Sequence, residues 1–208
     1  MMHPIGRKEL WHAEATLLVA IVLQFTISKK LQLGPKYLVA TLLLLLVFGI
    51  AFTAPRRHTG AAAPHLTIST LLIALVSIAN AGELVLLTNA LVHGTDIPGK
   101  SLLSGAFAIF LTNIIVFGLW YWELDSPGLS GRHKRSEDHF QFPQNQTGEH
   151  WRPTFFDYLY TSLTNSTAFS PTDTMPLTHI AKLLMSAQAL IALLTVVLVT
   201  ARAVNILG

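Results

Sequence analysis

Five long apolar runs constrain what this chain can fold into. They lie at residues 15–33, 37–54, 66–92, 102–122 and 180–207. A helix needs about 20 apolar residues to cross the roughly 30 Å hydrocarbon core of a bilayer. Only 12% of the residues are charged, against roughly 25% in soluble domains. The sequence therefore predicts an all-α, polytopic integral membrane protein with five transmembrane helices, lying as a multi-pass protein in the inner (plasma) membrane of the cell.

The composition also limits the chemistry. The chain has no cysteine, which excludes disulfides, thiolate catalysis and cysteine-ligated metals. Its histidines show no repeated ligand spacing, so we expect no metal site. The basic residues are scattered rather than gathered with aromatic residues, so we expect no nucleic-acid partner. No nucleophile–base pair or phosphate-binding loop is evident, so we expect neither enzymatic activity nor a cofactor.

A polar segment between the last two runs predicts a loop that enters the membrane without crossing it. Residues 153–165 predict a short helix, with Pro153 as its first residue and Asp157 in its first turn. The irregular stretch TNSTAFSPTDTMP follows from residue 164. Irregular backbone at membrane depth is tolerated only where it is buried in protein or lines a water-filled cavity. Aromatic clusters at 120–122 and 151–160 should mark one interface, so that the chain between them stays on one side.

The residues of this loop carry a resemblance. The run Thr167-Ala168-Phe169-Ser170-Pro171-Thr172-Asp173 resembles the T-T-V-G-Y-G-D filter of tetrameric potassium-type channels, and Pro176 falls on the proline that follows that filter. Leu159 and Ser162 match pore-helix positions, and Lys182 matches the basic position at the start of the inner helix. The chain also resembles a group of bacterial channel-like membrane proteins that share LWYWELD and AFSPTDTMPL.

The resemblance implies an organisation for the second half of the chain. It predicts a pore module at 101–208, with an outer helix (101–122), a turret (123–152), a pore helix (153–165), a filter-like loop (166–176) and an inner helix (178–207). Residues 1–100 would form a separate three-helix membrane region. The subunits would assemble as a homotetramer in the lipid bilayer. The family register places four inner-helix residues on the pore face: Ala189, Leu193, Val196 and Thr200. The polar spacing of Gln188, Thr195 and Arg202 indicates an adjacent face instead.

The departure from the family filter predicts altered selectivity. A potassium filter needs left-handed backbone that glycine adopts freely, and other residues lose about 1–2 kcal/mol each there. Ser170 and Thr172 replace both filter glycines, and Ser170 also precedes Pro171, which favours extended backbone. We therefore expect no carbonyl-lined potassium filter. Hydroxyl side chains, a Phe169 ring and a ring of Asp173 carboxylates would line the pathway instead; alternatively, Asp173 caps the inner helix.

Three functions remain open from the sequence. The first is a passive cation channel for K⁺ or Na⁺ with weak or altered K⁺ selectivity, and the second is a non-conducting scaffold or sensor. The third is a small transporter using Glu83, because an intramembrane carboxylate is costly and marks a functional site by default. Asn80 lies one turn before Glu83, and Asn113 is a candidate hydrogen-bond partner for it. The family topology places the N-terminus outside, although the basic residues then favour the outer side, contrary to the positive-inside rule.

Overall fold

The computed structural model describes residues 7–53, 65–125, 138–146, 151–167 and 173–207. The chain is mostly helical, as predicted. Its elements are α1 (Arg7–Gln24), the 3-10 turn η1 (Lys29–Leu31), α2 (Leu38–Thr53), α3 (His65–His93), α4 (Gly99–Asp125), β1 (Phe140–Gln141), the 3-10 turn η3 (Pro143–Gln146), α5 (Phe155–Thr167), β2 (Met175–Pro176) and α6 (His179–Leu207). The two short strands pair antiparallel, a feature that the all-α prediction lacked.

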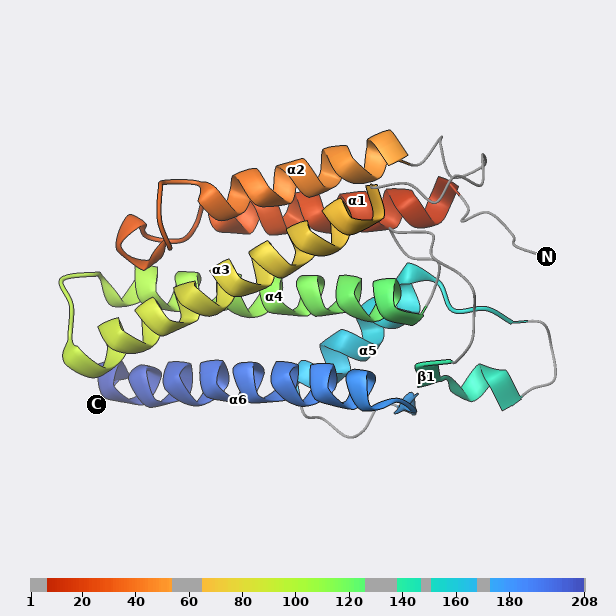
Figure 1. The fold of residues 1–208 in the computed structure, drawn as a ribbon. Helices are drawn as coiled ribbons and strands as arrows, with labels where there is room; N and C mark the ends of the chain where they lie inside the picture. Colours follow the sequence, from red (N-terminus) through yellow and green to blue (C-terminus); the bar gives the residue numbers. More distant parts are fainter. Residues whose placement is uncertain (1–6, 54–64, 126–137, 147–150, 168–172, 208) are drawn as a thin grey trace.

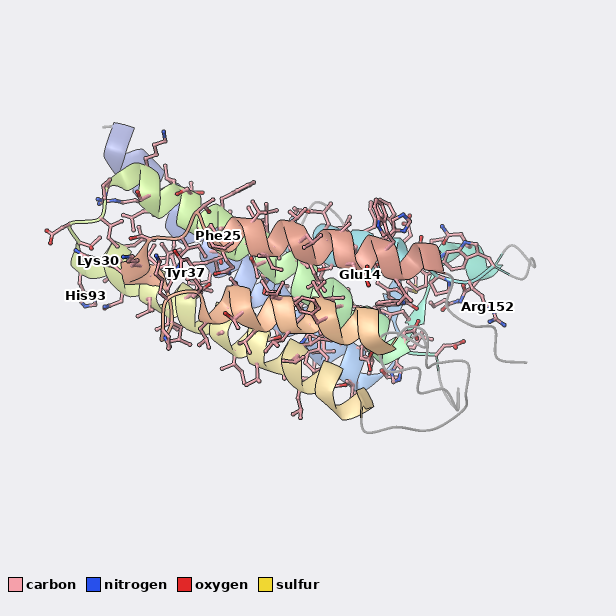
Figure 2. All side chains as sticks on the ribbon, turned by 90° about the horizontal axis from the view of Figure 1, so that it is seen from above. Glu14, Phe25, Lys30, Tyr37, His93 and Arg152 are labelled. Carbon is pink, nitrogen blue, oxygen red and sulfur yellow. The ribbon has the colours of Figure 1, made fainter. Side chains whose placement is uncertain are left out.

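The long helices run back and forth between two ends of an elongated bundle (Figure 1). One end, here called the ribbon end, holds the end of α4 together with β1 and β2. The other, here called the η1 end, holds η1, the α3–α4 turn and the end of α6. Figure 2 shows Lys30, Tyr37 and His93 at the η1 end and Arg152 at the ribbon end. The helix α1 begins at the ribbon end and α6 finishes at the η1 end, so the first and last helices have their outer termini at opposite ends of the bundle.

Three helices are long and apolar enough to cross a membrane. They are Thr70–His93 within α3, Gly99–Asp125, which is α4, and His179–Arg202 within α6. The apolar parts of α1 and α2 are shorter, at Leu10–Gln24 and Leu38–Gly49. The length and composition of the three long helices indicate a membrane protein. The prediction of five transmembrane helices is thus supported for three of them and stays a prediction for α1 and α2.

The predicted first run has the wrong bounds. The helix begins at Arg7 and ends at Gln24, so Lys29 and Lys30 belong to η1 and not to the end of a membrane helix. The side chain of Gln32 folds back, and its Nε2 donates to the backbone oxygens of Gln24 (3.4 Å) and Ile27 (3.2 Å). This amide therefore supports the last carbonyl of the helix, which also accepts the Ile27 N–H, and one carbonyl just beyond the helix.

One of two buried hydrophobic clusters in the described residues joins the two predicted regions. In α4, 72% of the most apolar stretch is buried, against 17% in α6. Leu17 of α1, Leu43 of α2 and Ile73 of α3 belong to the same buried cluster as Trp122 of α4 and Tyr158 of α5. The predicted N-terminal region therefore packs directly on the predicted pore module. The division at residue 100 remains a prediction.

The aromatic residues at the end of α4 lie inside the bundle. Tyr121 and Trp122 are fully buried, so their rings pack against the protein itself. That this cluster marks the membrane interface stays a prediction. The Trp122 ring packs against Phe155, and the Tyr121 ring packs against Phe140, each at 5.2 Å between ring centroids. The two aromatic clusters do meet at one end, as the sequence indicated. Trp122 is buried because α5 and β1 cover α4 there, which local hydropathy does not reveal.

Candidate functional site

The helix α5 is too short to cross a membrane. It has 13 residues, about 20 Å at 1.5 Å per residue. Thr154 is its N-cap: the Thr154 backbone N–H and Oγ1 donate to Oδ2 of Asp157 at 2.7 and 2.8 Å. The third helical residue thus accepts the N–H of the N-cap, which is one half of a capping box. Pro153 therefore lies just before the helix, not at its first position as predicted.

The helix α5 descends antiparallel along α4 from the ribbon end. Phe155 packs on Trp122 at that end, and further in the Oγ of Ser162 donates to the backbone oxygen of Ile114 at 2.6 Å. Between them, Gly118 lies against Leu159; a Cβ on Gly118 would lie 3.2 Å from the Leu159 Cα. The absence of a side chain at Gly118 thus allows the close approach. Leu159 and Ser162, singled out in the sequence as pore-helix positions, both face α4.

Gln188 joins three helices through one buried side chain. Its Nε2 donates to Ser162 O (3.0 Å), Ser162 Oγ (2.6 Å) and Ser166 Oγ (2.7 Å). Its Oε1 accepts from the Tyr121 hydroxyl and from Asn165 Nδ2 (2.9 Å). We call these five residues the Gln188 network. It connects α6 to the second half of α5 and to α4, so it holds α5 at a fixed depth in the bundle.

The helix α6 has one buried face and one exposed face. Gln188 and Thr195 are buried inside the bundle, and the Thr195 hydroxyl donates to its own helix at Ile191 O (2.8 Å). On the face that the family register would assign to a pore, Leu193 is 59% exposed and Val196 is 47% exposed. Ala189 is half-buried and Thr200 is exposed on that same face. The polar spacing therefore marks the inward side of α6, and the rest of the described chain leaves the family-register face largely uncovered.

The segment after the filter-like loop is tied to the turret. Oδ1 of Asp125 accepts the backbone N–H groups of His139 and Phe140, and Oδ2 accepts the Tyr158 hydroxyl at 2.7 Å. Strand β1 then pairs with β2, with Phe140 opposite Pro176, and Leu177 N–H donates to His139 O at 2.8 Å. The last part of the turret therefore fixes the entry into α6. The middle of the turret, at 128–137, lies outside the described residues.

The filter-like loop is described only at its two ends. Five of its residues lie outside the described residues: Ala168, Phe169, Ser170, Pro171 and Thr172. The expectation that their backbone forms no carbonyl-lined potassium filter therefore stays a prediction.

The predicted start of that loop at residue 166 is wrong, because α5 continues to Thr167. The Oγ1 of Thr167 donates to Leu163 O (3.1 Å) of its own helix, and Ser166 bonds Gln188, so both hydroxyls are used within the helix pair. Asp173 is exposed, and Thr178 takes the capping position of α6 by accepting Ala181 N–H at 3.4 Å.

Glu83 is fully buried and bonds α1, which the sequence did not indicate. Gln24 Nε2 donates to Glu83 Oε2 at 3.3 Å, and Asn80 Nδ2 donates to Ile109 O at 3.3 Å. The expected bridge from Glu83 to Asn113 is wrong: Asn113 Nδ2 is buried with no partner in the part of the chain that the structure describes. Gln24 was missed because it lies 59 residues from Glu83, in the middle of the first apolar run.

The described residues contain no group of three or more His, Asp or Glu side chains that could hold a metal ion. Comparison of the chain with protein-family models, curated proteins and solved structures returned no match. A proposal for the function of the α5–α6 region must therefore rest on its contacts and on the resemblance of its sequence to the filter region of potassium-type channels.

Proposed function

We propose that this protein is a potassium-channel-like membrane protein that forms a passive cation pathway in a homotetramer, with α5 as pore helix and α6 as inner helix. One observation carries the proposal. A helix too short to span enters the bundle at the ribbon end and is held there by the Gln188 network, and the chain is back at the same end by β2. A re-entrant loop needs this backbone path, with protein rather than lipid around it.

The charges favour a cation. The carbonyl end of α5 points into the bundle, and the partial negative charge of a helix C-terminus attracts cations. Asp173 is exposed between the filter-like loop and β2. Four copies around an axis would place a ring of carboxylates at the outer mouth, a common device in cation channels.

The uncovered face of α6 supports a pathway along the axis. Leu193, Val196 and Thr200 are exposed in the protomer, whereas α4 is largely enclosed. In the proposed tetramer this face lines the inner half of the pathway. The apolar parts of α1 and α2, Leu10–Gln24 and Leu38–Gly49, are about 23 and 18 Å long at 1.5 Å per residue, so they would complete five spans with local thinning of the bilayer.

Ion flux from proteoliposomes tests the pathway. We expect purified protein to pass both K⁺ and Na⁺ under separate gradients, and Asp173→Asn to lower the flux of both. Flux of K⁺ alone would contradict the selectivity argued from Ser170 and Thr172. Absence of flux under changes of voltage, pH and ions would support the alternative, a non-conducting channel-like scaffold.

Single cysteines test the face of α6, because the natural chain has none. Leu193→Cys and Val196→Cys should react with a membrane-impermeant thiol reagent. Leu194→Cys is the matched control: Leu194 is 46% exposed, close to the 47% of Val196, but it lies about 100° around the helix from Leu193 and about 160° from Val196, so lipid should shield it. Equal reaction at Leu194 and Val196 would mean that α6 does not line a water-filled pathway.

A further inference from the structure

A second group of polar atoms lies inside the protomer, between α1, η1, α3 and α4, and the proposed pathway does not use it. Oε1 of Glu83, Oδ1 of Asn80 and Oε1 of Gln32 are all buried, and none has a hydrogen-bond partner in the described ranges. Glu83 and Asn80 are three residues apart on α3, so their side chains lie on one face of that helix. Gln24 connects Glu83 to Gln32, because it donates to the first and its backbone oxygen accepts from the second.

The side-chain amide nitrogens of Gln32 and Asn80 determine which way each amide group is turned. Gln32 Nε2 faces two backbone oxygens, of Gln24 and Ile27, and Asn80 Nδ2 faces Ile109 O. Turning either amide over would put its oxygen against a carbonyl oxygen, which is repulsive. The unpaired atoms are therefore oxygens, not nitrogens. These three oxygens lack donors, while one buried donor on α4, Asn113 Nδ2, is also unpaired in the described ranges. An unpaired polar group buried in a low-dielectric interior is costly.

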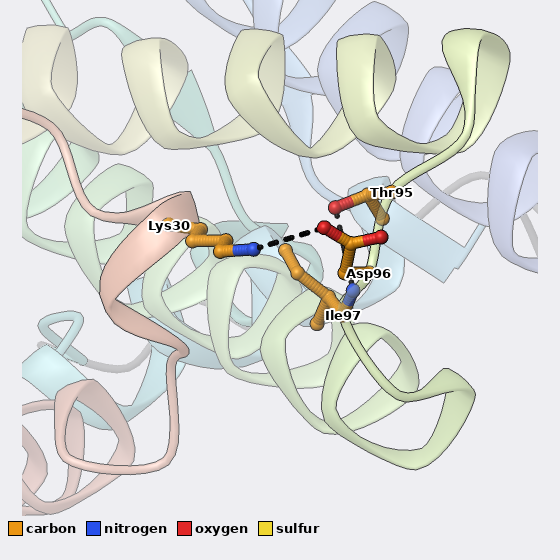
Figure 3. A network of polar contacts seen from close by, with 4 residues as sticks. All are labelled: Lys30, Thr95, Asp96 and Ile97. Atoms are coloured by element: carbon orange, nitrogen blue, oxygen red, sulfur yellow. Dashed lines mark hydrogen bonds and ion pairs between the residues drawn. The ribbon is translucent and has the colours of Figure 1, made fainter.

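A carboxylate makes the imbalance greater. Burying an unpaired negative charge costs far more than burying a neutral group, so it needs a positive partner or a proton. The described elements packed near Glu83 do not supply that partner: α2 carries no charged residue between Leu38 and Thr53, and Lys30 of η1 reaches outward to Asp96 at 3.7 Å (Figure 3). Glu14 lies on α1 well away from the η1 end (Figure 2).

The remaining charges on neighbouring elements are also placed elsewhere. Lys29 and Lys100 are exposed. Arg202 lies near the end of α6, and its Nε is buried without a hydrogen-bond partner in the described ranges. None of these three forms an ion pair with Glu83 in the described part of the chain. We propose that Glu83, with Asn80 and Gln32, forms a binding site for a compact monovalent cation, a proton or Na⁺, inside each protomer and separate from the α5–α6 pathway. Carboxylate and amide oxygens are the ligands that hard cations prefer.

The two cations are distinguished by two measurements on the purified full chain in lipid nanodiscs. Radioactive Na⁺ binding in choline buffer tests for the metal ion, and the infrared absorption of the carboxyl C=O group tests for the proton. Saturable Na⁺ binding that Glu83→Gln weakens at least tenfold would assign the site to Na⁺. A protonated carboxyl band that is lost in Glu83→Gln and disappears as the pH is raised would assign it to a proton. The control Glu14→Gln should keep either signal.

Two outcomes would overturn the proposal. One is an ionised Glu83 without saturable Na⁺ binding, and the other is a protonated band that does not change over the whole pH range in which the protein stays folded. If Glu83→Gln fails to fold, Asn80→Ala should still show the effect. It should weaken Na⁺ binding at least tenfold, or shift the pH midpoint of the carboxyl band by an amount equal to at least a tenfold change in proton concentration. Thr195→Val, which removes a buried hydroxyl that bonds its own helix α6, should not. Asp173→Asn should leave Na⁺ binding and the carboxyl band unchanged. A failure of the pore proposal, which ion flux tests, can therefore be told apart from a failure of the Glu83 site.

Discussion

Gln188→Leu tests whether the Gln188 network holds α5 in place. Leucine has a similar size, so the change removes the polar contacts with little cavity. The buried Tyr121 hydroxyl then loses its acceptor, and an unsatisfied buried donor costs about 1–3 kcal/mol. The lost bonds to Ser166 and Asn165 add about 0.6 kcal/mol each, the average for side-chain bonds inside membrane proteins. We expect a loss of about 2–4 kcal/mol in the free energy of unfolding.

The assay is reversible unfolding in mixed micelles with a rising fraction of denaturing detergent, followed by circular dichroism. Thr195→Val is the matched control on α6, because the buried Thr195 hydroxyl bonds only its own helix, at Ile191. It should cost about 0.6 kcal/mol or less. Adding Tyr121→Phe to Gln188→Leu removes the orphaned hydroxyl, so the double variant should be more stable than the sum of the singles predicts, by about 1–2 kcal/mol.

The reasoning fails if Gln188→Leu is as stable as Thr195→Val, or if the double variant is strictly additive. Either result would mean that apolar packing alone positions α5. If the network does hold α5, Gln188→Leu should also lower ion flux while membrane insertion stays normal, because the loop after α5 would no longer sit at a fixed depth.

Two further substitutions test the packing around α5 and the turret anchor. Gly118→Ala should destabilise the protein by about 1–3 kcal/mol, because the new Cβ meets the backbone of α5 at 3.2 Å, whereas Gly49→Ala, with open space around it, should be neutral or stabilising in the same unfolding assay. Asp125→Ala should cost about 3 kcal/mol, since a buried carboxylate accepting three hydrogen bonds is lost, and limited proteolysis should then cleave the turret faster. Its control, Asp96→Ala, breaks only the exposed ion pair with Lys30 and should change stability by less than about 1 kcal/mol; equal effects at both positions would contradict the anchor.

The apolar runs alone determined the helical class and the three long helices. Runs such as 66–92 and 102–122 exceed what a bilayer requires, and transfer of a side chain into hydrocarbon depends on that side chain rather than on its neighbours. The short helix α5 was also readable, because the polar sequence after it cannot lie in lipid. Its ends were not: Thr154 begins it through a bond to Asp157, and Thr167 extends it past the predicted loop start.

The tertiary structure decided which polar side chains meet. Gln188 reads in the sequence as one polar residue on an apolar helix, and only the packing of α5 shows that it turns inward to Ser162 and Ser166. Glu83 finds Gln24 rather than Asn113 for the same reason. The free energy of moving a side chain from water into the bilayer depends mainly on that side chain, so it can be read directly from the sequence. Hydrogen-bond partners depend on how helices distant in the chain cross and rotate, and that information exists only once they have packed.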